Sequence, residues 1–300
     1  MRLSTQQFFI QNLTNVQQSN AEIFKYQQQL STGKKLSKPS DDPLAATQIN
    51  KFERLIARND VFSRNVDVAE RRLNLEESTL TLVANTTLRI RDLSIQANNG
   101  SMNDRDLNII GEEINQLLGQ LVGAVNTQDA QGEYLFSGFK GQTQPYQLDD
   151  TTDEYIYRGD SGQRFLNVGE NTSIASTDAG AGIFGSGNQN LLNTVKIMAE
   201  ALKGDPPSKA AFNAQRDDLD RYYEQTVTTR SQIGARLNVL EDQREQLSDI
   251  KLFTQDTLSK FQDTDYYEAI SNLTLQQAAL EATYITFGKV QELNLFNYVR

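Results

Sequence analysis

Two series of residues, each repeating every seven positions and offset from one another by three, run through residues 52–97. The first series comprises Phe52, Asn59, Val66, Leu73, Leu80, Thr87 and Ser94, and the second comprises Leu55, Phe62, Ala69, Glu76, Val83, Ile90 and Ala97. A seam with this spacing is typical of a long helix packed along a partner. At ~1.5 Å per residue the helix is about 70 Å long, whereas a compact chain of this length is roughly 50 Å across. The sequence therefore predicts an elongated molecule.

This predicted helix has clear start and stop signals. Asp42 suits an N-cap, and Pro43 suits the first helical position because an N–H there would have no helical partner. Asn98-Asn99-Gly100 ends the helix. A second helix is predicted over about residues 104–127, because apolar residues recur there at spacings of three and four. These residues are Leu107, Ile110, Ile114, Leu117, Leu121 and Val125.

Residues 134–187 have a different character, with Gly, Thr and Asp around short β-prone runs. Residues 155–157 and 164–168 are predicted strands, and Gly159-Asp160-Ser161-Gly162 between them predicts a hairpin turn. A short helix over 191–203 follows, and Gly204-Asp205-Pro206-Pro207 breaks the chain. We expect one small β-rich insert.

Heptad spacing returns between residues 208 and 262. The series that recurs there is Ile233, Leu240, Leu247, Thr254 and Phe261, with a less regular companion series of Leu237, Arg244, Lys251 and Leu258. Because the companion series is irregular, we expect the seam to shift towards Ile250 and Phe253. Asp265, with Glu268 three residues later, predicts the cap of a last helix that runs to about residue 293.

The predicted fold is mainly α with a β-rich insert. The N- and C-terminal arms form an elongated antiparallel helical bundle, with a small β domain between them. We expect an N-terminal assembly helix (1–40), the N-terminal half of a helical rod (41–133), the outer insert (134–190), the C-terminal half of the rod (191–262) and a C-terminal assembly helix (263–300).

The N-terminal arm is poor in both charged and apolar side chains. Residues 3–21 carry no charge, and residues 1–30 hold eight Gln. Because most helical stability comes from packing, we expect such arms to order on contact with neighbours, including each other. The predicted assembly interface is one apolar stripe in each arm, made of Val16, Ile23 and Leu30, and of Leu273, Leu280 and Phe287.

Composition argues against several classes of function. The net charge of −10 disfavours nucleic acid. The chain has no Cys and no His, so it lacks thiolates, the usual zinc ligands and the commonest acid–base catalyst. No apolar run is long enough to span a membrane, and the N-terminal residues are too polar for a signal peptide. We expect no enzyme activity, no cofactor, no metal and no membrane or nucleic-acid partner.

Four short motifs have a simpler structural explanation. Residues 180–185 match the GxGxxG spacing, but neither a parallel sheet nor a following helix is expected around them. Arg158-Gly159-Asp160 spells an adhesion tripeptide at a position where a turn is already expected. Asp41-Asp42 suits helix capping better than metal binding, and the acidic residues of 149–154 lack the EF-hand spacing.

Several segments resemble the flagellin superfamily. Residues 2–5, 29–35 and 40–43 are similar to its N-terminal signature, and residues 277–282 and 293–296 to its C-terminal helix. Leu135-Phe136-Ser137-Gly138, where the insert begins, resembles the hook-associated protein 3 branch. The resemblance covers roughly residues 1–140 and 205–300. Its signature positions are Thr32, Gly33, Asp41, Asp42, Pro43, Leu135, Phe136, Ser137 and Gly138.

The resemblance implies nested helical layers in which both termini form an inner tube and the insert faces outward. It implies a structural subunit of the bacterial flagellum that joins hook to filament, secreted by type III export without signal-peptide cleavage and therefore extracellular. The implied partners are copies of the chain itself in a ring or tube, hook-associated protein 1, flagellin and an export chaperone. Two other functions stay open. The short insert argues against flagellin itself, and the uncharged N-terminus argues against a cytoplasmic coiled-coil adapter.

Overall fold

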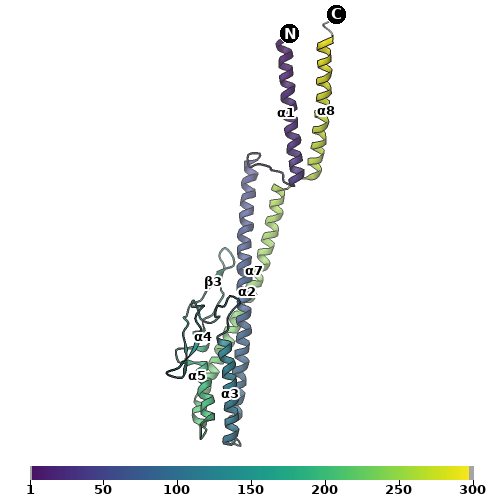
Figure 1. Ribbon diagram of the computed structural model, residues 1–300. Coiled ribbons are helices and arrows are strands. Elements are labelled where there is room, and N and C mark those ends of the chain that lie inside the picture. Colours follow the sequence, from purple (N-terminus) through teal and green to yellow (C-terminus); the bar gives the residue numbers. More distant parts are fainter. Residues whose placement is uncertain (1, 297–300) are drawn as a thin grey trace. The chain divides into compact units, whose positions relative to one another are not determined.

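The computed structural model describes residues 2–296, and the side chains of residue 7 and residues 9–289 (Figure 1). Its helices are α1 (Arg2–Thr32), α2 (Pro43–Ala97), α3 (Asp104–Val125), α4 (Gly180–Phe184), α5 (Leu191–Lys203), α6 (Lys209–Ala214), α7 (Arg216–Gln262) and α8 (Tyr266–Phe296). Its strands are β1 (Tyr146–Asp149), β2 (Glu154–Tyr157), β3 (Phe165–Asn167), β4 (Ser173–Ala175), β5 (Gly185–Ser186) and β6 (Gln189–Asn190). As predicted, the fold is mainly helical with a small central region that contains the strands. None of the described helices is long and apolar enough to cross a lipid bilayer.

The chain forms two compact units. The first unit consists of Met1–Arg58 and Asp249–Arg300, and the second consists of Asn59–Ser248. Helices α2 and α7 contribute residues to both units. The side chains of residues 2–5, which belong to the sequence signature, lie outside the described set.

Helix α2 begins and ends where the sequence predicts. The Asp42 carboxylate accepts hydrogen bonds from the backbone N–H groups of Leu44 and Ala45 at 3.1 and 3.0 Å, and α2 ends at Ala97. In the second unit the predicted seam is buried except at Phe62, which is half-buried. Asn59 at its start donates from Nδ2 to the carbonyl oxygen of Leu247 at 2.9 Å. The buried seam residues of α2 are Asn59, Val66, Ala69, Leu73, Glu76, Leu80, Val83, Thr87, Ile90, Ser94 and Ala97.

Helix α7 keeps its heptad spacing as far as Thr254, and the predicted shift of its seam is wrong. The last residue of the predicted series, Phe261, is exposed. Leu240, Leu247 and Thr254 are buried, whereas Ile250 and Phe253 are exposed. The hydroxyl of Thr254 donates to the carbonyl oxygen of Ile250 at 2.6 Å. Because that bond satisfies the hydroxyl inside the helix, a polar residue can hold the seam position and the spacing does not have to change.

Helices α3 and α5 pack against each other in the second unit. Asn103 caps α3 by accepting a hydrogen bond from the Asp106 N–H at 2.9 Å, and the Asp106 carboxylate accepts one from the Asn103 N–H at 3.4 Å, which is a reciprocal capping box. On α3 Leu118 is buried, whereas the predicted Leu117 is half-buried. Gln215 separates α6 from α7.

The strands of the insert pair differently from the prediction. β2 pairs with β1 and β3 pairs with β4, both antiparallel, so the predicted hairpin between 155–157 and 164–168 is wrong. The Asp149 carboxylate accepts hydrogen bonds from the N–H groups of Thr151 and Thr152, at 2.9 and 3.4 Å, which closes the β1–β2 turn. Residues 159–162 do turn, but Asp160 binds the N–H of Phe139 at 2.9 Å and so fixes the turn to residues before β1.

The insert shares its core with the helices of the second unit. Tyr146 is fully buried, and its ring centroid lies 5.1 Å from that of Tyr157 and 6.3 Å from that of Phe184. Its hydroxyl donates to the carbonyl oxygen of Gly185 at 2.7 Å. Tyr146, Val168 and Phe184 belong to the same hydrophobic cluster as the seam of α2 and the buried faces of α3 and α5. The insert is therefore part of the core of this unit.

Candidate assembly interface

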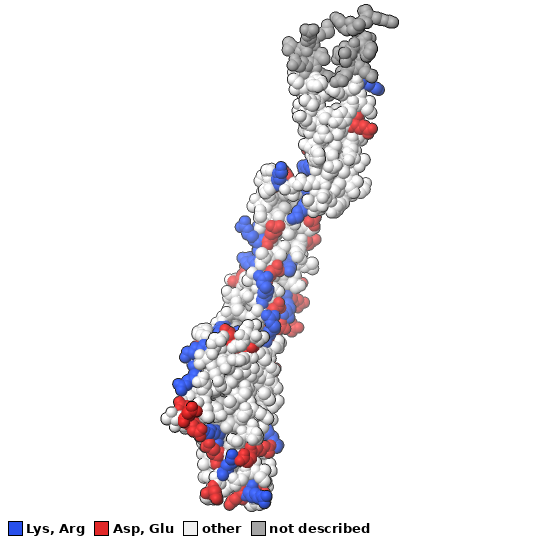
Figure 2. Space-filling view, in the orientation of Figure 1, with Lys and Arg blue, Asp and Glu red and all other residues white. Residues whose placement is uncertain are grey.

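Helices α1 and α8 pack along each other in the first unit, and the two ends of the chain lie at the same end of the pair (Figure 1). The two helices are therefore antiparallel. The rings of Phe9 and Phe287 lie 5.4 Å apart across the pair. On the face drawn in Figure 2, the described part of this pair carries very few charged side chains, as the uncharged segment 3–21 predicts.

The structure brings the two predicted apolar stripes together within one chain. Ile23 is 9% exposed, and Val16 and Leu30 on the same face of α1 are half-buried. On α8, Leu273, Leu280 and Phe287 are half-buried as well. Since α8 is the helix packed along α1, these six residues form the seam of the pair.

A second set of apolar side chains is exposed on this pair, and the heptad spacing does not predict it. Phe24 on α1 is 70% exposed and Tyr267 on α8 is 87% exposed. On α8 some of these side chains line a groove of about 560 Å³. The residues that line it are Tyr267, Ile270, Ser271, Thr274, Leu275 and Ala278. The other residues of this set are Ile10, Leu13, Tyr284 and Ile285. The available signal was apolar residues outside the heptad series on both helices.

The signature residues at the end of α1 connect it to the start of α8. Gly33 adopts a φ of +70°, which favours glycine, and a Cβ there would lie 3.1 Å from the Tyr266 hydroxyl oxygen. The carbonyl oxygen of Gly33 accepts from the Thr264 N–H at 2.9 Å, and the Lys35 N–H donates to the carbonyl oxygen of Gln262 at 2.7 Å. Thr32 adds a bond from its hydroxyl to the carbonyl oxygen of Gln28 at 2.8 Å. These bonds fix the base of the α1–α8 pair.

The acidic signature residues organise the backbone. The Asp41 carboxylate accepts from the Lys38 N–H at 3.0 Å, while Asp42 and Pro43 start α2. Nowhere in the described part of the chain do three acidic side chains gather so that they could hold a metal ion.

The signature residues Leu135, Phe136, Ser137 and Gly138 lie in the second unit and are structural. The first three are buried, and the ring of Phe136 packs edge-on against Phe184 at 5.1 Å. Gly138 has a φ of +70°, and a Cβ there would lie 2.2 Å from the Asp160 carboxylate. This segment anchors the insert and presents no reactive group.

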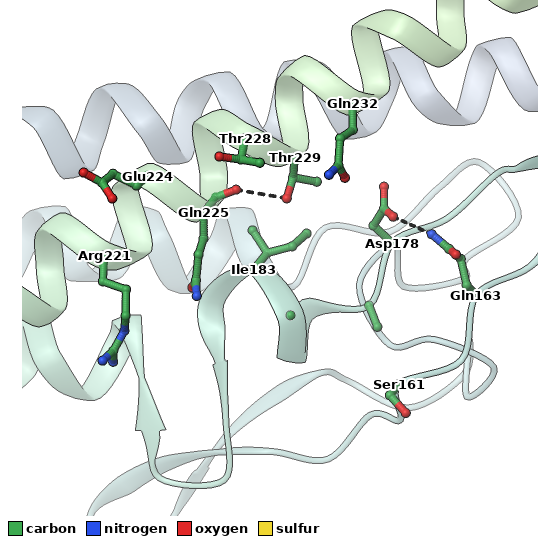
Figure 3. A pocket seen from close by; sticks show the side chains of 12 residues that line it. Ser161, Gln163, Asp178, Ile183, Arg221, Glu224, Gln225, Thr228, Thr229 and Gln232 are labelled. Carbon is green, nitrogen blue, oxygen red and sulfur yellow. Dashed lines mark hydrogen bonds between the residues drawn. The ribbon is translucent and has the colours of Figure 1, made fainter.

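A cleft of about 580 Å³ lies between the insert and α7 in the second unit (Figure 3). Most of the residues that line it are polar, and Gln163 donates to Asp178 across its edge at 2.7 Å. The GxGxxG residues reach it through α4, a five-residue helix that follows the antiparallel strand β4. Because a dinucleotide site requires a parallel sheet and a full helix, this segment is not such a site.

A network of charged groups is buried beside this cleft. Glu76, on the α2 seam, is 1% exposed. Burial, and next the charge of Asp178, raise its pKa well above the usual value, whereas Arg236 and Arg72 act in the opposite direction. In the same unit Arg72 and Arg164 lower the pKa of Glu133 by hydrogen bonding to it. These groups hold the insert against α2 and α7, and none is a nucleophile with an adjacent base.

Two segments of the chain match known families. Residues 3–141 match the bacterial flagellin N-terminal helical region, and residues 217–299 match the bacterial flagellin C-terminal helical region. The matched segments contain α1, α8 and the α2 and α7 parts of both units.

Curated relatives match over the full length. The flagellar hook-associated protein 3 of Salmonella typhimurium (strain LT2) is 30% identical over 321 residues, which span 100% of both chains. That of Escherichia coli (strain K12) is 29% identical over 315 residues, 99% of each chain. The solved structure of the flagellar junction protein FlgL of Legionella pneumophila has the same fold, with a TM-score of 0.60 and 22% identity over 72% of this chain and 100% of that one.

Proposed function

This chain belongs to the flagellin family, in its hook-associated protein 3 branch, and we propose on that premise that it joins hook to filament through its α1–α8 pair. It is a structural subunit of the bacterial flagellum and assembles with other flagellar components.

One observation supports the α1–α8 pair as the joining part. The stripe residues pack in the seam between α1 and α8 of the same chain. Apolar side chains as large as Phe24 and Tyr267 nevertheless stay exposed on the outer faces of the pair. Contiguous exposed apolar surface on a protein marks an interaction site. A ring or tube of copies would cover these faces. The same faces would also contact the proteins on the hook side and on the filament side.

The proposed partners are copies of this chain, hook-associated protein 1 on the hook side and flagellin on the filament side. An export chaperone would cover the exposed face of α8 before secretion. We propose that the protein is extracellular, that it is exported without cleavage, and that it has no catalytic role.

Sheared flagella from the source organism test this function. We expect the uncleaved chain there as a minor component by intact mass spectrometry, and we expect a deletion strain to build hooks and secrete unpolymerised flagellin. A flagellin would instead be the dominant component. Normal filaments in the deletion strain would contradict the proposal.

A further inference from the structure

Helix α2 presents a basic groove on the surface of the first unit. The groove has a volume of about 430 Å³ and is lined by Thr47, Asn50, Lys51, Arg54, Leu55 and Arg58. These positions recur at spacings of three and four, so they lie along one helix face. Lys51 and Arg54 are exposed and Leu55 is half-buried. The groove therefore has an apolar floor and a basic rim.

Helix α7 presents an apolar and acidic face in the same unit. Asp249, Leu252, Phe253 and Asp256 stand at i, i+3, i+4 and i+7, which places them on one helix face. Leu252 is 69% exposed and Phe253 is 73% exposed. Asp256 forms an exposed ion pair with Lys260 at 2.7 Å, a kind of pair that stabilises little. Across the described residues, Asp249 has no ion-pair partner.

We propose that the α7 face of one copy docks into the α2 groove of a neighbouring copy. Phe253 covers the apolar floor at Leu55, and Asp249 pairs with the basic rim at Arg54. This inference rests on the proposed self-assembly and specifies which surfaces of the first unit meet.

Charge selects this pairing over the alternatives. Residues 33–58 carry six basic and three acidic side chains, whereas residues 249–268 carry two basic and five acidic ones. Two α2 grooves, or two α7 faces, would repel each other, because like charges placed opposite one another are unfavourable. The attractive contact joins two different surfaces of identical chains, and contacts of that kind generate rings or helical tubes.

Charge reversal in the full-length protein tests the pairing. Arg54→Glu and Asp249→Arg are each expected to lower the amount of chain in isolated flagella by about tenfold, because each places like charges opposite one another. The double variant Arg54→Glu/Asp249→Arg restores the opposite charges and should return incorporation close to that of the parent. Glu53→Arg, a charge reversal at an exposed neighbour outside the groove, is the matched control and should assemble normally.

Cysteine cross-linking gives a second readout, since the chain has no Cys of its own. Cells that express an Asn50→Cys chain together with a Leu252→Cys chain should yield a mixed disulfide in isolated flagella, and Glu53→Cys with Leu252→Cys should not. Normal incorporation of both single reversals, or a double variant as defective as the singles, would overturn the docking mode. Absence of the parent chain from flagella would instead contradict the proposed function.

Discussion

Arg236 of α7 donates two hydrogen bonds to the carboxylate of Asp178 in the insert, at 2.6 and 3.1 Å. Both side chains are largely buried. Asp178 also lies close to the buried carboxyl group of Glu76 on α2, and its charge helps to raise the pKa of that group. Asp178 of the insert thus pairs with α7 and lies beside a buried carboxyl group of α2. The insert is therefore packed against both long helices of the second unit.

Removing Arg236 should loosen the insert. Arg236→Met leaves the Asp178 carboxylate buried without its partner, and the expected loss is about 2–4 kcal/mol of unfolding free energy, since breaking a buried ion pair is strongly destabilising. Arg244→Met is the matched control on the same helix. Arg244 binds Asp67 and Glu70 at an exposed site, so its loss should be below about 1 kcal/mol. Denaturant melts of both variants decide this, and equal losses would contradict the assignment.

Glu76 should make the stability of the protein depend on pH. In the unfolded chain its pKa is the ordinary 4.5, and in the folded protein it is well above that value. The folded state therefore holds the proton more tightly, so the contribution is fully present below pH 4.5 and is lost as pH rises through the raised pKa. This is the opposite direction to an exposed, salt-bridged carboxylate.

Glu76→Gln mimics the protonated side chain at every pH and should remove this dependence. We expect the variant and the parent to melt alike near pH 4. Near pH 9 the variant should melt higher, by about 2–4 °C for each kcal/mol regained. Thermal melts at the two pH values test this, and Glu245→Gln at an exposed position of α7 controls for the loss of an acidic group. If the difference in melting temperature between the variant and the parent is the same at both pH values, the prediction is wrong.

Gly138 should tolerate no side chain. In Gly138→Ala the methyl group meets the Asp160 carboxylate at 2.2 Å and its carbonyl oxygen at 2.6 Å, with φ at +70°. The expected loss is about 2 kcal/mol or more. Gly119→Ala on α3 is the control, because a Cβ there meets nothing within 4 Å and Ala favours the helix by about 0.5–1 kcal/mol. Opposite signs in denaturant melts are expected, and a neutral Gly138→Ala would be contrary to the structure.

The helical part of the fold could be predicted because its signals are local and repeated. Asp42 and Pro43 fix the start of α2, and seven-residue spacing carries the seam over many turns. The strand pairing could not be predicted, because the turn residues at 159–162 looked like a hairpin. Their partner, the N–H of Phe139, is distant in sequence. Tertiary contacts decided between two acceptable turns.

The candidate interface was predicted only in part for a similar reason. A heptad stripe such as Val16, Ile23 and Leu30 predicts that a helix packs on something, but not whether the partner is its own chain. The structure gives these positions to the α1–α8 seam. It leaves Phe24, next to Ile23 in sequence, on the outside.

Ile23 and Phe24 should therefore separate the two roles of α1. Ile23→Ser removes a buried group from the α1–α8 seam, so the pair should open more often in the free subunit. Amide exchange in α1 and α8 should then rise by about tenfold or more, the factor that 1.4 kcal/mol produces. Phe24→Ser removes a side chain that is 70% exposed and makes few contacts within the chain, so exchange in the free subunit should stay at the parent's rate. Assembly, by contrast, should be impaired by Phe24→Ser. In the assembly the Phe24 ring would be covered by neighbouring chains, and its loss recurs in every copy. Flagella from cells carrying Phe24→Ser should hold less of the chain than those of the parent, although the subunit is as stable. If Phe24→Ser assembles normally, the outer face of α1 is not the joint. If Ile23→Ser leaves amide exchange unchanged, the seam does not hold the two helices together.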